Sequence, residues 1–174
     1  MLQSTNPTAQ QSQRWIIQAL LDLMEITQYD KINVSEICRK SGLDRRTFYR
    51  NFDSKKDVLE EYISLLGEEY ISMYTKIENH NSYTASKFFF EFWSRYIYFI
   101  KNIKKCGLSD FVFQQFEKFT KQHTELLIGD DVQKLPAEYV FAYKNGGFWN
   151  VMLTWIENDA MLSPDEMALI ISKI

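Results

Sequence analysis

Apolar residues recur along most of this 174-residue chain at the three- and four-residue spacing of amphipathic helices. One stripe predicts a helix from about Gln13 to Gln28, and a longer one predicts a helix of about 24 residues that Ser54 caps. Further stripes predict helices over about 83–106, 110–127 (capped by Ser109), 136–158 and 164–174. Only three Pro and six Gly interrupt the pattern, so the sequence predicts an all-α protein.

Two short helices are expected between the first two stripes, because their capping residues are easily recognised. Asn33 and Glu36 have the spacing of a capping box, which predicts a helix from Val34 to about Ser41. Gly42 suits the left-handed conformation that ends a helix. Asp44 can cap the second short helix, from Arg45 to about Phe52. The segment therefore has the order of a helix-turn-helix.

This segment is basic in an otherwise acidic chain. The whole chain has 20 Lys and Arg against 23 Asp and Glu, whereas residues 39–56 hold seven basic and two acidic residues. Positive charge concentrated on a helix-turn-helix pattern predicts contact with DNA. Arg39 and Lys40 point away from the expected core, and each remains open between a phosphate contact and simple solvation.

The second short helix is expected to present its outer face to DNA. Phe48 and Phe52, four residues apart, face the core and leave polar and aromatic side chains outside, where they can bond base edges and phosphates. Lys55 begins the next helix and Ser35 lies in the first turn of the preceding one, and both can hold phosphates. The predicted DNA-binding residues are Ser35, Arg45, Arg46, Thr47, Tyr49, Asn51 and Lys55.

The spacing of this segment resembles that of the DNA-binding domain of TetR-family bacterial transcription regulators. The resemblance covers roughly residues 12–60 and rests on the pattern Ile37-x4-Gly42-Leu43-x3-Thr47-Phe48-Tyr49-x2-Phe52-x2-Lys55-x3-Leu59. A C-terminal subtype common among Gram-positive members has a run similar to Gly146-Gly147, Trp155-Ile156-Glu157-Asn158 and Ser163-Pro164-Asp165-Glu166. Arg46 stands where many members have Gly or Pro, and Asn51 where many have His, so the resemblance does not predict an operator sequence.

The resemblance implies an N-terminal three-helix helix-turn-helix domain, residues 1–57. The long helix would join it to a helical ligand-binding and dimerisation domain, residues 58–174. The implied function is a homodimeric regulator, usually a repressor, that binds a near-palindromic double-stranded DNA operator and responds to a small-molecule effector. The alternative is a TetR-like protein-interaction module or coactivator without operator binding of its own.

The C-terminal part is unusually aromatic, with 11 Phe, 8 Tyr and 3 Trp in residues 58–174. One interpretation is a bulky core plus a dimer interface, and the other is a cavity for an apolar or aromatic effector. His123 lies on an apolar stripe and is open between a satisfied core residue and a ligand contact. The predicted cavity residues are Tyr62, Leu66, Tyr70, Phe89, Phe92, Trp93, Tyr96, Phe116 and His123.

Two apolar stripes near the C-terminus predict a four-helix dimer interface about a two-fold axis. Gly146 and Gly147 interrupt the first of the two helices. They indicate either a helix start or kink, or a close helix approach in a dimer or room beside a ligand. The predicted interface residues are Phe148, Val151, Met152, Trp155, Met167, Ile170, Ile171 and Ile174.

The residue types argue against other classes. Two His and two Cys lack metal-ligand spacing, and there is no Ser-His-Asp set or Gly-rich phosphate loop. We therefore expect no enzyme, no metal and no cofactor. The first eleven or so residues are polar and expected to fray. No window reaches the roughly 20 apolar residues of a membrane span, so we expect a cytoplasmic protein without a membrane partner.

Overall fold

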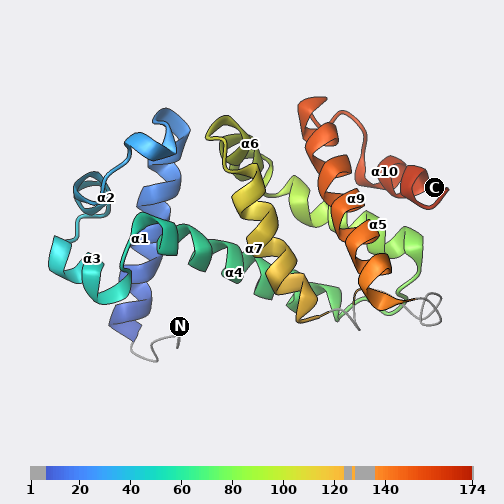
Figure 1. Ribbon diagram of the computed structural model, residues 1–174, viewed down its shortest axis with the longest axis horizontal. Coiled ribbons are helices and arrows are strands. Elements are labelled where there is room, and N and C mark those ends of the chain that lie inside the picture. Colours follow the sequence, from blue (N-terminus) through green and yellow to red (C-terminus); the bar gives the residue numbers. More distant parts are fainter. Residues whose placement is uncertain (1–6, 124–126, 128–135, 174) are drawn as a thin grey trace.

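The computed structural model describes residues 7–123, 127 and 136–173, and all regular secondary structure in these ranges is helical. The all-α prediction is confirmed. In chain order the elements are α1 (Pro7–Ile26), the 3-10 helix η1 (Tyr29–Lys31), α2 (Val34–Ser41), α3 (Arg45–Asn51), α4 (Lys55–Tyr74), α5 (Ser82–Ser94), α6 (Ile97–Lys105), α7 (Ser109–Lys121), α9 (Ala137–Glu157) and α10 (Pro164–Ile171) (Figure 1).

The helices form two groups joined by α4. Helices α1, α2 and α3 lie at one end of the molecule, and α5, α7, α9 and α10 lie toward the other (Figure 1). Helix α4 contacts α1 in the first group and α7 and α5 in the second. Helix α6 contacts α1 as well as α7 and α9, so it is a second link between the groups. Because α4 is continuous, the domain boundary after residue 57 stays a prediction.

The helix ends agree with the capping residues. The side chains of Asn33 and Glu36 form the reciprocal capping box of α2, and Gly42 ends that helix with a φ of 70°. The Asp44 carboxylate caps α3 by accepting a 2.6 Å hydrogen bond from the Thr47 amide, and this bond lowers the pKa of Asp44. Further capping boxes open α4 and α10, formed by the pairs Ser54–Asp57 and Ser163–Glu166.

The prediction of one helix over 83–106 is wrong. Two helices, α5 and α6, occupy this stretch, and Arg95 and Tyr96 lie between them outside either helix. The last turn of α5 tightens, since the amides of these two residues donate to the carbonyls of Phe92 and Trp93. Both side chains then bond the carboxylate of Glu69 in α4. The break is therefore stabilised by a contact that is distant in sequence.

Smaller boundaries also differ. Helix α1 begins at Pro7, so residues 7–11 are helical rather than frayed. Helix α4 is shorter than expected, at 20 residues. Ser109 is the first residue of α7 instead of its cap, and the capping position is Leu108. Only the one-residue difference at Ser109 lies within the one or two residues by which helix ends are usually uncertain.

The core accounts for many of the aromatic residues. In α5 the run from Phe88 to Phe90, together with Phe92 and Trp93, is entirely buried. Helices α4 and α7 approach closely at Gly67, where an added Cβ would lie 2.7 Å from the ring of Phe119. A side chain at this position would therefore fit only if the Phe119 ring moved.

Candidate nucleic-acid interface and effector cavity

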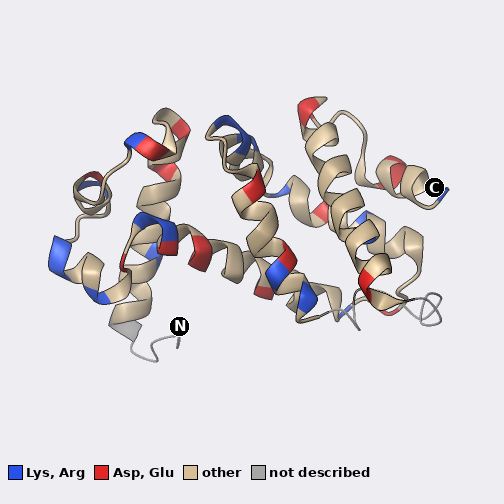
Figure 2. Cartoon of the chain, in the orientation of Figure 1, with Lys and Arg blue, Asp and Glu red and all other residues tan. Residues whose placement is uncertain are grey.

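Helix α3 presents a basic face to solvent. Phe48 is completely buried and holds α3 against the rest of the helix-turn-helix, while Arg45, Arg46, Tyr49 and Arg50 are exposed. Figure 2 shows Lys and Arg at both ends of this helix. Among the other predicted DNA contacts, Ser35 is exposed, whereas Thr47 and Asn51 are half-buried. The structure thus brings these residues together on α2 and α3.

The arginine at the start of α3 is held in place by its neighbours. Its guanidinium donates to the Ser35 hydroxyl at 3.4 Å and to the Tyr49 hydroxyl at 3.5 Å, and it lies 5.9 Å from the centre of the Tyr49 ring. These bonds are long and exposed, so Arg45 keeps donors for another partner, because a guanidinium has five. Asn51 donates through its amide to the Thr47 carbonyl at 2.8 Å, which leaves its side-chain carbonyl to accept.

Lys55 is engaged within the protein, in contrast to the expectation of a phosphate contact. Its ammonium donates to the carbonyls of Tyr29, Asp30 and Ile32 at 2.6, 3.2 and 2.7 Å. It also lies 4.5 Å from the centre of the Tyr29 ring. An ammonium has three N–H donors, and all three are used. The side chain therefore fastens the start of α4 to the connection between α1 and α2.

Burial has a further effect at this contact. It raises the pKa of Tyr29 to about 12, and the nearby charges of Asp30, Asp57 and Glu60 add to the shift.

Elsewhere in the helix-turn-helix, Lys40 pairs with Asp22 of α1 at 3.2 Å. This pair favours a surface role for Lys40 over a phosphate contact.

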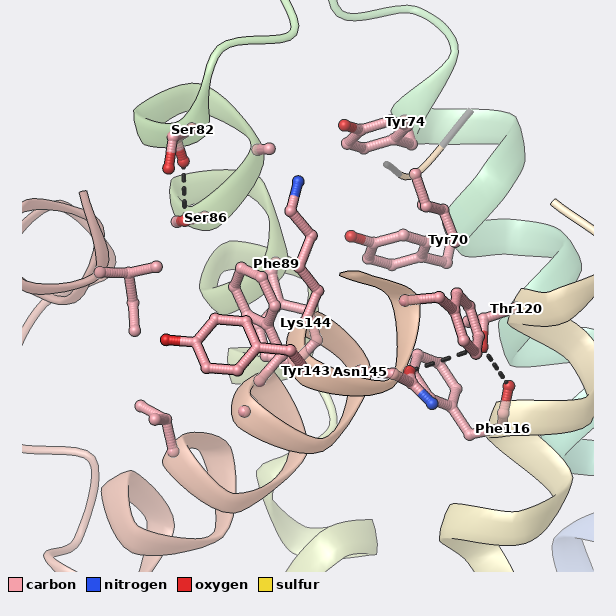
Figure 3. A pocket seen from close by; sticks show the side chains of 17 residues that line it. Tyr70, Tyr74, Ser82, Ser86, Phe89, Phe116, Thr120, Tyr143, Lys144 and Asn145 are labelled. Carbon is pink, nitrogen blue, oxygen red and sulfur yellow. Dashed lines mark hydrogen bonds between the residues drawn. The ribbon is translucent and has the colours of Figure 1, made fainter. Parts of the chain in front are cut away.

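A cavity of about 260 Å³ lies at the far end of α4, between α4, α5, α7, α9 and α10. Its wall combines aromatic and aliphatic side chains with a few polar ones (Figure 3). The lining residues are Tyr70, Tyr74, Ser82, Ala85, Ser86, Phe89, Phe116, Thr120, Leu127, Phe141, Tyr143, Lys144, Asn145, Gly147, Phe148, Val151 and Ile171.

Three of the predicted cavity residues, Tyr70, Phe89 and Phe116, line this cavity. Others lie elsewhere. The core encloses Leu66, Phe92 and Trp93; Tyr62 and Tyr96 line a second cavity of about 200 Å³ beside α1. His123 lines neither cavity and contacts the ring of Phe119 at 4.9 Å.

Several polar residues of the cavity were missed from the sequence. Thr120 donates to the Phe116 carbonyl at 2.9 Å, and its hydroxyl lies 3.5 Å from the side-chain carbonyl of Asn145. The side-chain N–H₂ of Asn145 is buried without a partner among the described residues. Lys144 and Asn145 follow each other between two cavity residues, Phe141 and Phe148. Adjacent polar residues inside an apolar helix were the signal that could have revealed them.

Part of the predicted dimer interface is buried inside the protomer, and this corrects the expectation. Met152, Trp155 and Met167 belong to the core of the chain itself. Trp155 packs against Phe90 with ring centroids 5.3 Å apart, and its indole N–H donates to the Leu162 carbonyl at 2.8 Å. These side chains cannot reach a partner while this fold persists.

The other predicted interface residues divide into three sets. Phe148, Val151 and Ile171 line the cavity, Ile170 is 44% exposed, and Ile174 lies outside the described residues. Large apolar side chains are nevertheless exposed on α9, α10 and the turn between them. These are Tyr139 and Tyr143 near the start of α9, Met161 and Leu162 in the turn, and Leu169 and Ile170 on α10, and together they are called here the C-terminal apolar surface.

The paired glycines of α9 do not start or end a helix. Helix α9 continues through Gly146 and Gly147, so the helix-start interpretation is wrong. An added Cβ at either position would meet no neighbour within 4 Å in the described part of the chain. Gly147 borders the cavity, and within the protomer neither glycine is needed for a close helix approach.

The described residues hold no group of three or more His, Cys, Asp or Glu placed to bind a metal ion. No helix in the same ranges is long and apolar enough to span a membrane.

Comparisons with known proteins agree along most of the chain. Residues 16–62 match the family model described as "Bacterial regulatory proteins, tetR family". Residues 80–174, more than half of the chain, match the model described as "Transcriptional regulator C-terminal region". No curated protein matches the sequence.

Two solved structures share the fold. The fatty acid degradation regulator FadR from Bacillus halodurans superposes with a TM-score of 0.69 at 16% identity, over 98% of this chain and 95% of that one. The dihydroxyacetone kinase operon activator DhaS superposes with a TM-score of 0.60 at 18% identity, over 93% of this chain and 92% of that one. These likenesses show an N-terminal helix-turn-helix domain followed by a helical C-terminal domain.

Proposed function

We propose, from the premise that this chain belongs to the TetR family of bacterial DNA-binding transcription regulators, that it is a ligand-responsive repressor. In this proposal a homodimer binds a near-palindromic operator, and a small molecule in the cavity of α4, α5, α7, α9 and α10 releases it. The observation that carries the proposal is the position of α4. Its first residue is fastened to the helix-turn-helix, and its last turns line the cavity.

Helix α3 is proposed to enter the major groove. The contacts are those of the exposed face of α2 and α3, namely Ser35, Arg45, Arg46, Thr47, Tyr49 and Asn51. Arg45 and Asn51 suit guanine and adenine edges, whereas Arg46 and the hydroxyls suit phosphates. The Lys55 side chain is left out because its three donors are already used.

The homodimer is proposed to form through the C-terminal apolar surface instead of the buried stripes. Exposed apolar patches on soluble proteins commonly mark interaction sites. A two-fold axis through this surface would place two α3 helices on successive turns of DNA, roughly 34–36 Å apart or a multiple of this distance. This geometry is what a near-palindromic operator requires.

The effector is proposed to act by holding one of two arrangements of α4. Helix α4 has 20 residues, about 30 Å at 1.5 Å per residue. Tyr70 and Tyr74 in its last turns line the cavity, and Lys55 ties its first turn to η1. A ligand shifts the equilibrium only as far as its affinities for the two arrangements differ.

The names of the two similar structures leave the sign of regulation open to test, since one is called an activator. Repression is proposed here on the general tendency of the family. No catalytic role is proposed, and a regulator of chromosomal genes would act in the bacterial cytoplasm.

The deciding experiment is selection of genomic fragments by the purified protein, followed by an electrophoretic shift with the wild type and with Arg46→Ala. The proposal expects a specific, near-palindromic fragment that the wild type retards and the variant retards weakly. Retention of no fragment by a folded dimer would contradict it and favour the interaction module. Transcription from the selected promoter, measured with and without the protein, decides between repression and activation.

A further inference from the structure

The cavity of α4, α5, α7, α9 and α10 opens on one side of α9. Most of its lining residues are buried or half-buried, and the exposed ones are Ser82 at the start of α5 and Tyr143 and Gly147 on α9. Tyr143 is 73% exposed although it lines the cavity. It projects from α9 away from the buried residues Phe116 and Thr120 (Figure 3). In a single protomer, a molecule in the cavity would therefore stay in contact with water beside Tyr143 and Gly147.

The surface of α9 next to this opening carries no charge. The exposed residues of α9 from 139 to 154, here called the α9 face, are Tyr139, Ala142, Tyr143, Gly147, Asn150 and Thr154. They recur mostly every three or four residues, over about 22 Å of helix. Charged residues make up 25% of the chain, and the outer face of a helix in a soluble protein normally carries them. The α9 face therefore has the character of a surface that becomes covered.

The polar side chains of the α9 face already bond their own helix. Asn150 donates through its amide to the Gly146 carbonyl at 2.8 Å, and the Thr154 hydroxyl donates to the Asn150 carbonyl at 3.0 Å. Burying a polar group is costly chiefly when the group has no hydrogen bond. Another surface can therefore cover these two donors without breaking the bonds that they make.

Contacts within the protomer do not explain the two glycines in the middle of this face. A glycine in a helix interior is destabilising relative to alanine. At Gly146 and Gly147 an added Cβ would meet no neighbour within 4 Å in the described ranges. A glycine also allows another backbone to approach closely. A helix from outside the protomer would account for both residues.

We propose that α9 of a second copy of this chain crosses α9 at Gly146 and Gly147, covers the opening and completes the cavity. A second copy is the occupant because an uncharged face can meet itself about a two-fold axis without bringing like charges together. The α9 face is also continuous with the C-terminal apolar surface, with which it shares Tyr139 and Tyr143. The inference rests on the proposed homodimer and goes beyond it, because it makes effector binding depend on dimer formation.

This dependence acts in both directions. If each cavity binds a molecule more tightly in the dimer than in the monomer, the molecule tightens the dimer by the same factor for each site. Covering about 60 Å² of apolar ligand surface, at about 25 cal/mol per Å², corresponds to a factor of about ten. We therefore expect the dimer to bind an apolar molecule about tenfold or more tightly than the monomer does.

The test uses N-phenyl-1-naphthylamine, a neutral apolar fluorescent probe, and the full-length protein. Probe affinity is measured by fluorescence, and the association state of the same samples is measured by sedimentation. At protein concentrations that favour the dimer, the probe should bind about tenfold or more tightly than at concentrations that favour the monomer. A saturating amount of probe should also keep the protein dimeric at lower protein concentrations.

Two variants and a control locate the effect. Ile170→Glu places a charge on the C-terminal apolar surface at a residue that does not line the cavity. It should stay folded, sediment as a monomer and bind the probe about tenfold more weakly. Gly146→Ala, also outside the cavity lining, should keep its helix content and weaken the dimer and probe binding together. Gln114→Glu, at an exposed position of α7, is the matched control for the added charge and should change neither.

The outcomes separate this inference from the proposed function. A monomeric Ile170→Glu that binds the probe as tightly as the wild type would overturn the inference and leave the proposed homodimer standing. A wild-type dimer that does not bind the probe would also overturn it. A dimeric Ile170→Glu would count against the proposed interface, and an unchanged dimer and probe affinity in Gly146→Ala would overturn the crossing at the glycines. Operator retardation, measured on the same preparation, decides the DNA-binding half of the proposed function in every case.

Discussion

The ammonium of Lys55 offers the sharpest test of how the helix-turn-helix is fastened to α4. Lys55→Met retains an unbranched apolar side chain and removes three hydrogen bonds of 2.6, 3.2 and 2.7 Å together with the ammonium that lies over the Tyr29 ring. A hydrogen bond to a charged group contributes about 1.5–3 kcal/mol. Because Lys55 is only half-buried, water can replace part of this contribution, and we expect a total loss of about 2–3 kcal/mol. For a chain of this size that corresponds to a fall of roughly 5–10 °C in Tm.

The assay pairs a thermal melt with operator affinity measured over a range of salt concentrations. A phosphate contact would contribute about 0.9 to the slope of log affinity against log salt. If Lys55 bonds only the three backbone carbonyls, the salt slope of Lys55→Met should be unchanged. Its operator affinity should then be reduced by the same factor at every salt concentration. Arg46→Met is the positive control and should reduce the slope by about 0.9. Lys56→Met, at an exposed position that pairs with Glu60, should change the stability by less than about 0.5 kcal/mol.

The opposite pattern would refute the reasoning. If Lys55→Met melts like the wild type and its salt slope falls by about 0.9, the ammonium holds a phosphate. The three carbonyl contacts would then be dispensable.

Four further predictions test other parts of the structure. Tyr49→Ala should lose about 1–3 kcal/mol of operator affinity at unchanged Tm, measured by electrophoretic shift; an unaltered affinity would argue against α3 as the reading helix. Gly67→Ala places a Cβ 2.7 Å from a ring of α7 and should lower the free energy of unfolding by about 1–3 kcal/mol in urea, whereas a neutral result would mean that the two helices separate easily. Ile170→Glu should sediment as a monomer at low micromolar concentration, while Trp155→Glu should instead melt early because it buries a charge; a stable Ile170→Glu dimer would place the interface elsewhere. The pKa of Tyr29 is raised from 10.0 to about 12, so the stability that its neutral phenol contributes is complete below pH 10 and is lost progressively as the pH rises toward 12. Tyr29→Phe should therefore flatten the fall in Tm between pH 10 and 12. Equal slopes of Tm against pH in the two proteins would contradict this assignment.

Local signals in the sequence were sufficient for the helix-turn-helix. The caps at Asn33, Asp44 and Ser54 each bond a backbone amide three residues away, so the physical cause lies within the stretch of sequence that shows the pattern. Gly42 belongs to the same class, since its left-handed φ of 70° is a property of a single residue. The bounds of α2 were accordingly predicted without error.

Contacts between distant residues could not be predicted in this way. The break after α5 depends on Glu69, which bonds the Tyr96 side chain 27 residues further along the chain. Helical spacing also cannot distinguish an apolar stripe that faces the core from one that faces a partner subunit. Trp155 was therefore predicted to lie in the dimer interface, although it packs on Phe90 within the protomer. The donors of Lys55 were assigned to DNA for the same reason, because their acceptors lie 23 to 26 residues earlier.

The uninterrupted helix α4 fixes a rotational phase between the cavity and the DNA. Each residue of an α-helix turns the chain by about 100°, because a turn has 3.6 residues. A single residue inserted in α4 between Lys55 and Tyr70 would swing the two tyrosines to a different side relative to α3, even if both ends folded correctly. An insertion of seven residues would restore the direction to within about 20° and lengthen the helix by roughly 10 Å. Chimaeras that join this C-terminal part to another helix-turn-helix should therefore respond to the effector only when the junction keeps the helical register.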